Sequence, residues 1–124
     1  MERLYKRFVN EVLDEKGMLK DISFNIPDDY NFGFDVIDEI ARRTPDKKAM
    51  IWLSQYKEEK IFTFSDMSRY SNKVANYFRS LGIKKGDKVM LVLKRRYEFW
   101  FSILALHKLG AVAIPATHQL MKKD

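Results

Sequence analysis

The chain has 124 residues, of which 23 are Lys or Arg, 17 are Asp or Glu, two are His and none is Cys, and its formal net charge is +6. One domain of ordinary size accounts for this length, and 46% hydrophobic residues exclude a disordered tail. A sequence without cysteine has no disulfide, thiolate metal site or cysteine nucleophile, and two histidines argue against a histidine-based zinc site.

Residues 1–31 predict an N-terminal helix followed by an extended lead-in. The helix is expected over residues 2–16, ending at Gly17, because apolar side chains recur there at roughly helical spacing. These side chains are Leu4, Tyr5, Phe8, Val12 and Leu13. Around Pro27 the pattern breaks up, which favours extended or turning backbone. An early acid and the lack of an apolar stretch argue against a secretory signal, so we expect a cytoplasmic protein.

Residues 32–64 predict a helix and then a β-hairpin. Apolar residues at helical spacing indicate the helix over about 34–43, and Thr44-Pro45 ends it because the residue before proline avoids the α region. Two short apolar runs, 49–53 and 60–64, flank a polar turn and predict the hairpin.

The next helix carries clear boundary signals. Ser65 is a candidate N-cap, and Met67, Tyr70, Val74 and other apolar residues recur at spacings of three and four. Gly82 is placed to end this helix as a left-handed glycine.

Residues 88–115 predict a βαβ unit, which places the chain in the α/β class. A strand at about 88–93, apolar without alternation, is expected to be buried on both faces. A largely apolar helix follows at about 97–109, and a second buried strand at about 111–114 ends at Pro115. Such a unit is expected to be parallel and right-handed. No run approaches the roughly 20 apolar residues that a membrane span requires.

Charge is unevenly distributed along the chain. Residues 1–60 carry 11 basic and 13 acidic side chains, whereas residues 61–124 carry 12 basic and 4 acidic ones. The basic residues form short clusters at element ends, with no basic helix and no aromatic motif of the ribonucleoprotein type. A solvated surface is the favoured interpretation, a patch facing ligand phosphates is the second, and nucleic-acid binding is the third.

Residues with catalytic or metal-binding spacing are absent from the sequence. No glycine-rich phosphate loop, nucleophile elbow or metal-spaced histidine pair occurs, so no catalytic, cofactor-binding or metal residue is assigned. Arg96, Thr117 and His118 follow the two predicted parallel strands, at the edge where open α/β sheets bind ligands, and are candidates for a pocket edge. His107, Trp52 and Trp100 are interpreted as structural, with a hydrogen-bonded His107 and both tryptophans in the core.

Five short motifs, in this order and spacing, carry a family resemblance over about 32–120. They are Phe34-Asp35-Val36-Ile37-Asp38, Thr44-Pro45-Asp46-Lys47-Lys48-Ala49, Phe62-Thr63-Phe64-Ser65-Asp66-Met67, the stretch from Leu81-Gly82-Ile83 through Lys88-Val89, and Leu109-Gly110-Ala111-Val112-Ala113-Ile114-Pro115. This pattern resembles the N-terminal part of the adenylate-forming acyl-CoA synthetases. The ending Pro115-Ala116-Thr117-His118 is most similar to the acetyl- and medium-chain branches.

The resemblance implies that residues 32–124 begin the large N-terminal domain of such an enzyme. The family reaction joins a small-molecule carboxylate to coenzyme A, using ATP and Mg²⁺, through an acyl-adenylate and with release of AMP and pyrophosphate. The family's phosphate loop, ribose-binding aspartate and C-terminal lysine have no counterpart here, so the resemblance implies an inactive N-terminal fragment whose partner is the rest of the enzyme.

Two alternatives remain open on the sequence. One is a stand-alone interaction or dimerisation module derived from this subdomain, and the other is a basic nucleic-acid-binding domain. Uncovered strand edges and apolar faces also predict that the isolated chain self-associates.

Overall fold

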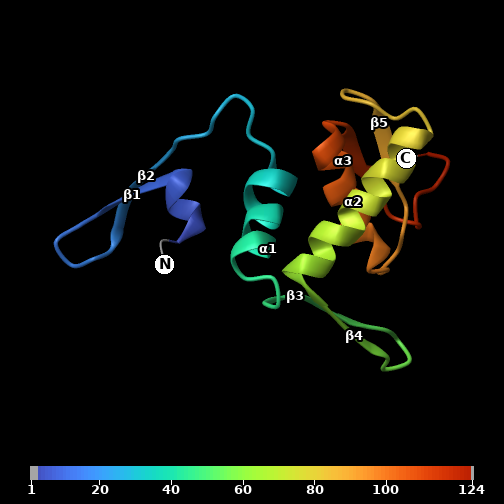
Figure 1. The fold of residues 1–124 in the computed structure, drawn as a ribbon, viewed down its shortest axis with the longest axis horizontal. Helices are drawn as coiled ribbons and strands as arrows, with labels where there is room; N and C mark the ends of the chain where they lie inside the picture. The colour runs from blue at the N-terminus through green and yellow to red at the C-terminus, as the bar shows by residue number, and fades with distance from the viewer. Residues whose placement is uncertain (1–2, 124) are drawn as a thin grey trace. The chain divides into compact units, whose positions relative to one another are not determined.

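The computed structural model describes residues 3–123 and divides after Tyr30 into two compact units. The first unit contains the 3-10 helix η1 (Leu4–Arg7) and the strands β1 (Val9–Leu13) and β2 (Leu19–Phe24). The second contains η2 (Phe32–Asp38), α1 (Glu39–Arg43), β3 (Lys48–Leu53), β4 (Glu59–Thr63), α2 (Phe64–Ser80), β5 (Lys88–Leu91), α3 (Glu98–Leu109) and β6 (Val112–Pro115) (Figure 1).

The first unit is an antiparallel hairpin, so the prediction of a helix over residues 2–16 is wrong. β1 and β2 pair from Val9 opposite Phe24 to Leu13 opposite Leu19. The reason lies in the turn, where the Asp14 carboxylate accepts the backbone N–H groups of Lys16 and Met18, both at 2.8 Å. Gly17, with φ of 77°, completes the reversal instead of ending a helix. These local bonds outweigh a loose helical spacing whose apolar side chains are mostly exposed.

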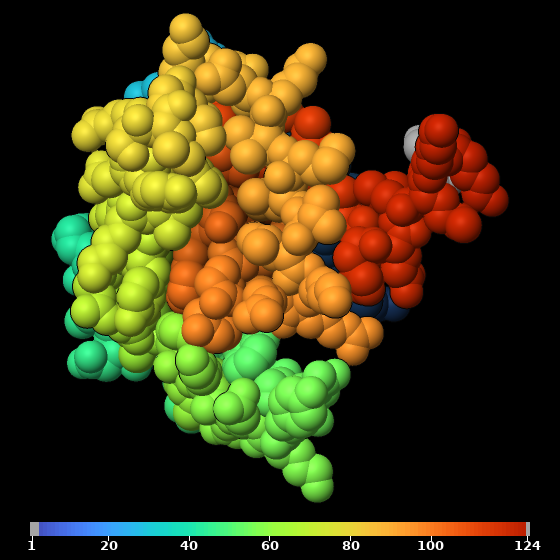
Figure 2. All heavy atoms as spheres, turned by 90° about the vertical axis from the view of Figure 1, so that its right-hand side faces the viewer, coloured from blue at the N-terminus to red at the C-terminus, as the bar shows by residue number. Residues whose placement is uncertain are grey.

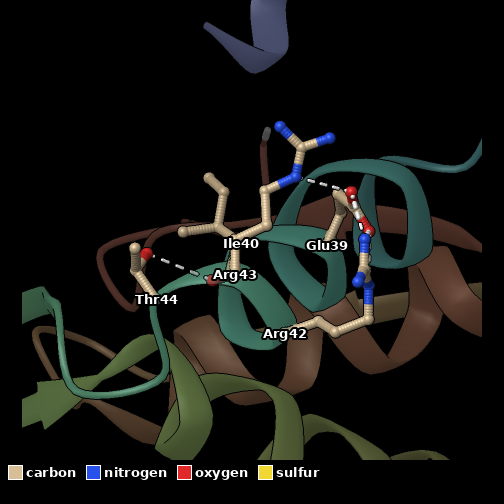
Figure 3. A network of polar contacts seen from close by, with 5 residues as sticks. All are labelled: Glu39, Ile40, Arg42, Arg43 and Thr44. Carbon is tan, nitrogen blue, oxygen red and sulfur yellow. Dashed lines mark hydrogen bonds and ion pairs between the residues drawn. The ribbon is translucent and has the colours of Figure 1, made fainter. Parts of the chain in front are cut away.

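The predicted helix over 34–43 is present, but its first part is wound as a π-helix, which is wider than an α-helix. η2 is a π-helix that continues into α1, and the Asn31 side chain accepts the N–H groups of Gly33 and Phe34 at its start. In α1 the Glu39 carboxylate accepts hydrogen bonds from both following arginines, at 2.8 Å from Arg42 Nη2 and 2.6 Å from Arg43 Nε (Figure 3). These bonds, of which the one from Arg42 has the largest effect, hold the pKa of Glu39 below its usual value.

The predicted hairpin over 49–64 is confirmed as β3 and β4. Met50 pairs with Phe62 and Trp52 with Lys60, and this face turns toward the core. The opposite face carries Ile51, Leu53 and Ile61, all of which are exposed.

The N-cap of α2 lies two residues before the predicted one. Thr63, not Ser65, is the N-cap: its hydroxyl accepts the Asp66 N–H at 3.1 Å, and the Asp66 carboxylate accepts the Thr63 N–H at 3.0 Å. This reciprocal pair is a capping box, with Asp in place of the usual Glu or Gln. At the other end Gly82 adopts φ of 90°, and the N–H of Ile83 reaches the Phe78 carbonyl at 3.1 Å, as predicted for a left-handed glycine stop.

The βαβ unit is present, and its two strands are parallel as predicted. β5 pairs with β6 from Lys88 opposite Val112 to Leu91 opposite Pro115, with α3 between them in the chain. Burial on both faces is wrong, however. Val89 and Leu91 face the core, whereas Met90 and Val112 on the other face are exposed.

α3 lies between two apolar clusters, which explains why apolar residues cover most of its circumference. Phe101 and Leu104 join Phe62 and Met67 in the first cluster, beside the hairpin and α2. Leu106 belongs to the second cluster, with Leu91 of β5 and Ala111. Trp52 packs against the first cluster, but Trp100 is 51% exposed, so its assignment to the core is wrong.

α2 and α3 are the longest helices of the described chain, and both appear side by side in Figure 1. Figure 2 shows α2, in yellow-green to yellow, along the outer surface next to the orange segments that include β5 and α3. Within residues 3–123 no helix combines the length and the apolar character needed to cross a membrane.

Candidate functional site

The carboxyl ends of β5 and β6 lie next to each other and bring the predicted candidates to one edge. The ladder closes with a hydrogen bond from the Ala116 N–H to the Leu91 carbonyl at 3.0 Å. Thr117 and His118 follow β6 after one intervening residue, and Arg96 stands in the connection between β5 and α3. All three side chains are exposed, and no hydrogen bond or ion pair joins them to one another in the described part of the chain. They stay candidates for a pocket edge.

The turn Lys94–Arg96 is held by long-range and local bonds. Trp52 Nε1, on β3, donates to the Arg95 carbonyl at 2.7 Å, and the Arg96 N–H donates to the Leu93 carbonyl at 3.0 Å. Lys94 has φ of 46°, in the left-handed region that a non-glycine residue enters at a cost. The backbone of the turn is therefore fixed, while its three basic side chains extend into solvent.

An aromatic hollow of about 370 Å³, which no sequence pattern predicted, adjoins this turn through Tyr97. Its lining residues are Lys60, Ile61, Phe62, Tyr70, Tyr97 and Phe101. Lys60 Nζ donates to Tyr97 Oη at 3.1 Å and lies 4.6 Å from the centre of that ring. This hydrogen bond raises the pKa of Lys60 above its usual value. The hollow thus combines aromatic surfaces with the positive charge of Lys60.

Two buried polar atoms of α3 have no hydrogen-bond partner among the described residues. They are Glu98 Oε2, in the first turn of α3, and His107 Nδ1, near its end. His107 meets Phe32 edge-on at 6.2 Å, and its carbonyl accepts the Asn31 side-chain N–H at 2.7 Å. The prediction of a hydrogen-bonded His107 is therefore wrong for its ring, although its position is structural.

Lys108 also has a role that the sequence did not predict. Its side chain is 2% exposed, and its Nζ donates to Asp38 Oδ1 and to Asn72 Oδ1, each at 2.7 Å. A Cβ on Gly33 would lie 2.7 Å from Lys108 Cγ, so only glycine leaves room for this lysine. Lys108 joins η2, α2 and α3, and its buried charge has a structural role.

These residues do not fit ATP with Mg²⁺. Among residues 3–123 no three His, Asp or Glu side chains gather in a group that could hold a metal ion. The strand edge offers basic and hydroxyl groups, but no carboxylates placed for a divalent cation and no glycine-rich backbone cradle for a triphosphate.

Comparison with known proteins identifies relatives over most of the chain. The family model described as AMP-binding enzyme matches residues 37–124. The human acyl-coenzyme A synthetase ACSM3, mitochondrial, is 34% identical over 115 residues, which cover 88% of this chain and 20% of the relative. The crotonobetaine/carnitine–CoA ligase of Salmonella arizonae is 38% identical over 87 residues, which cover 70% of this chain and 17% of the relative.

Solved structures of similar fold are also acyl-activating ligases and synthetases. A Mycobacterium tuberculosis fatty acyl CoA synthetase superposes with a TM-score of 0.64 at 30% identity, over 73% of this chain and 17% of that one. A fatty acid AMP ligase from Legionella pneumophila superposes with a TM-score of 0.67 at 23% identity, over 73% and 16% of the two chains, and so shares the fold. The present chain spans about a fifth of the length of its curated relatives.

Proposed function

Because this chain belongs to the AMP-binding enzyme family, we propose that it serves as the N-terminal part of an ATP-dependent acyl-CoA synthetase. The reaction of the whole enzyme would join a carboxylate, such as a fatty acid, to coenzyme A, with an acyl-adenylate as intermediate and AMP and pyrophosphate as products. The observation that carries the proposal is the match of residues 37–124 to the family, together with relatives named as acyl-CoA synthetases.

Within that enzyme the proposed contribution of this chain is structural. α3 connects two apolar clusters, and the β5–β6 pair presents a parallel edge with the basic turn Lys94–Arg96. Positive side chains at such an edge would favour the approach of anionic substrates. The chain alone is proposed to be inactive, because its described residues fit neither ATP nor Mg²⁺. Cytoplasmic localisation, favoured by the sequence, is also part of the proposal.

The first experiment measures ATP–pyrophosphate exchange by the purified chain with acetate, hexanoate and decanoate. We expect no exchange above the enzyme-free blank, because no residue is placed to bind the triphosphate. Exchange that depends on one of these acids would contradict the proposed inactivity.

The second experiment tests the family role in an active enzyme. In a chimera, residues 37–115 of this chain replace the matching segment of human ACSM3, with unmodified ACSM3 as control. We expect acyl-CoA formation within about tenfold of the control, since a structural segment of the same fold preserves the catalytic residues supplied by ACSM3. A chimera that folds cooperatively and yet forms no acyl-CoA would contradict the proposal.

A further inference from the structure

Positive charge is concentrated in one stretch of the second unit. Residues 67–97 contain a single acid, Asp87, and nine basic residues. These are Arg69, Lys73, Arg79, Lys84, Lys85, Lys88, Lys94, Arg95 and Arg96, and all nine are exposed. The Asp87 carboxylate accepts the backbone N–H of Lys84 at 2.9 Å, so it is engaged with the turn. This density of exposed charge predicts attraction to an anionic surface.

Exposed residues recur every fourth position along α2 and its C-terminal cap. Arg69, Lys73 and Tyr77 of α2 and the C-cap residue Leu81 follow this spacing, and Lys84 lies in the turn after the helix. Residues four apart lie next to each other on a helix, so Arg69, Lys73, Tyr77 and Leu81 form a strip, and Lys84 adds a positive charge just beyond its end. We call these five residues the docking strip. Figure 2 shows α2 and its yellow C-terminal end on the outer surface.

The docking strip combines apolar and basic side chains. Tyr77 and Leu81 are each 60% exposed, although the neighbouring Phe78 packs into the second apolar cluster. Of the three cations, Arg69 pairs with Asp66 at 3.0 Å, and Lys73 Nζ lies 5.8 Å from the Tyr70 ring. Within the described chain neither Lys73 nor Lys84 has a carboxylate partner. Two lysines are therefore available to anions beside two exposed apolar side chains.

We propose that the docking strip binds the surface of an anionic phospholipid bilayer. Tyr77 and Leu81 enter the headgroup boundary, while Lys73 and Lys84 contact lipid phosphates or serine carboxylates. A basic helix side with exposed aromatic and aliphatic residues has the chemistry of an interfacial helix. Leu81 provides no stacking surface for a base, which favours a bilayer over a nucleic acid. The association is peripheral, and it is independent of the proposed acyl-CoA synthetase role.

The experiment measures co-sedimentation of the 124-residue chain with vesicles of phosphatidylcholine alone and with vesicles containing about one third phosphatidylserine. We expect binding only to the anionic vesicles. Raising the salt from 0.1 M to 1 M shortens the screening length from about 10 Å to about 3 Å and should release the protein. Equal binding to neutral vesicles would overturn the proposal, as would binding that is unchanged in 1 M salt.

Charge variants test the strip itself. Lys73→Ala with Lys84→Ala should weaken binding roughly 25-fold, since each basic residue near the surface contributes about fivefold. The matched control, Lys122→Ala with Lys123→Ala, removes the same charge from the C-terminal segment and should weaken binding by less than about threefold. Equal losses in the two double variants would show that only net charge matters, and would overturn the proposal.

Apolar variants test insertion. The double variant Tyr77→Ser with Leu81→Ser keeps the charge and should weaken binding about tenfold through lost apolar burial. The control, Met18→Ser with Leu120→Ser, changes two other exposed apolar residues and should have little effect. Tyr77→Trp provides a fluorescence readout of insertion that does not depend on weakening the binding or the fold. Its emission, after subtraction of the signal from Trp52 and Trp100, should shift to the blue with anionic vesicles. An unshifted spectrum, or tighter binding to a single-stranded RNA oligomer than to the vesicles, would refute docking to lipid.

Discussion

Lys108 shows how a single buried charge can join several elements. It stands in the last turn of α3, where a lysine is normally solvated, yet its side chain is enclosed. Asp38 and Asn72 accept its hydrogen bonds from η2 and α2, and the Phe34 ring lies 5.5 Å from its Nζ. A buried ammonium is tolerated only when such partners replace its hydration.

Replacing this lysine should destabilise the second unit. Lys108→Met removes the ammonium and leaves Asp38, which is partly exposed, without its ion-pair partner, so we expect the free energy of unfolding to fall by about 2 kcal/mol. Urea denaturation followed by circular dichroism measures the change, with Lys123→Met as a control expected within about 0.5 kcal/mol of the parent. Adding Asp38→Asn to Lys108→Met should cost less than the sum of the single changes, and strict additivity would argue against the pair.

At the scale of elements, α2 is bounded by bonds that its own sequence supplies. The capping box of Thr63 and Asp66 closes the start of the helix, and the left-handed Gly82 closes its end. The Asp66 carboxylate accepts a hydrogen bond from the Thr63 backbone N–H, and this bond lowers the pKa of Asp66 most. Bonds from the Thr63 hydroxyl and from Arg69 lower it further. The ionised form of Asp66 is therefore the one that stabilises the helix.

This cap predicts a pH-dependent stability. A carboxyl whose pKa is lowered by folding contributes stability above its unfolded pKa, about 4, and the contribution is lost as the pH falls through the folded pKa. Asp66→Asn should thus destabilise the protein by about 1 kcal/mol at pH 7, and by progressively less toward pH 2. Urea titrations across this range measure the gap between parent and variant. A gap that stays constant with pH would exclude the ionised cap, and Asp28→Asn, in a loop, serves as the control.

At the scale of the second unit, two small sheets each leave one apolar face open. Ile51, Leu53 and Ile61 cover the outer face of the β3–β4 hairpin, and Met90 and Val112 lie on the outer face of β5–β6. Contiguous exposed apolar groups of this kind favour association with another surface. The excess of basic residues in 67–97 opposes contact between two copies at low salt.

Self-association should therefore increase with salt, whereas the proposed lipid binding decreases. We expect the weight-average mass from analytical ultracentrifugation to rise above that of a monomer at high protein concentration in 1 M salt, where charge repulsion is screened. Leu53→Ser should reduce this rise because it removes part of the hairpin's outer apolar face, and Leu120→Ser is the matched control. A monomer at all concentrations and salt levels would contradict the prediction.

The sequence predicted the elements whose signals are local. α3 and the β3–β4 hairpin occupy nearly their predicted ranges, because continuous apolar runs and turn residues report directly on nearby backbone. The edge position of Arg96, Thr117 and His118 was also predictable, since parallel strands bring their carboxyl ends together. The hairpin at residues 9–24 was not, because the hydrogen bonds of the Asp14 turn compete with a helical pattern of similar strength.

The amino-acid sequence by itself thus determined the α/β class, the family, the C-terminal end of α2 and the concentration of positive charge. The tertiary structure alone decided that Lys108 is buried, that Trp52 holds the basic turn, and that Lys60 meets Tyr97 in an aromatic hollow. Each of these contacts joins residues at least 36 positions apart. Periodicity and capping arise from neighbours within a few residues, whereas such contacts depend on how the elements pack.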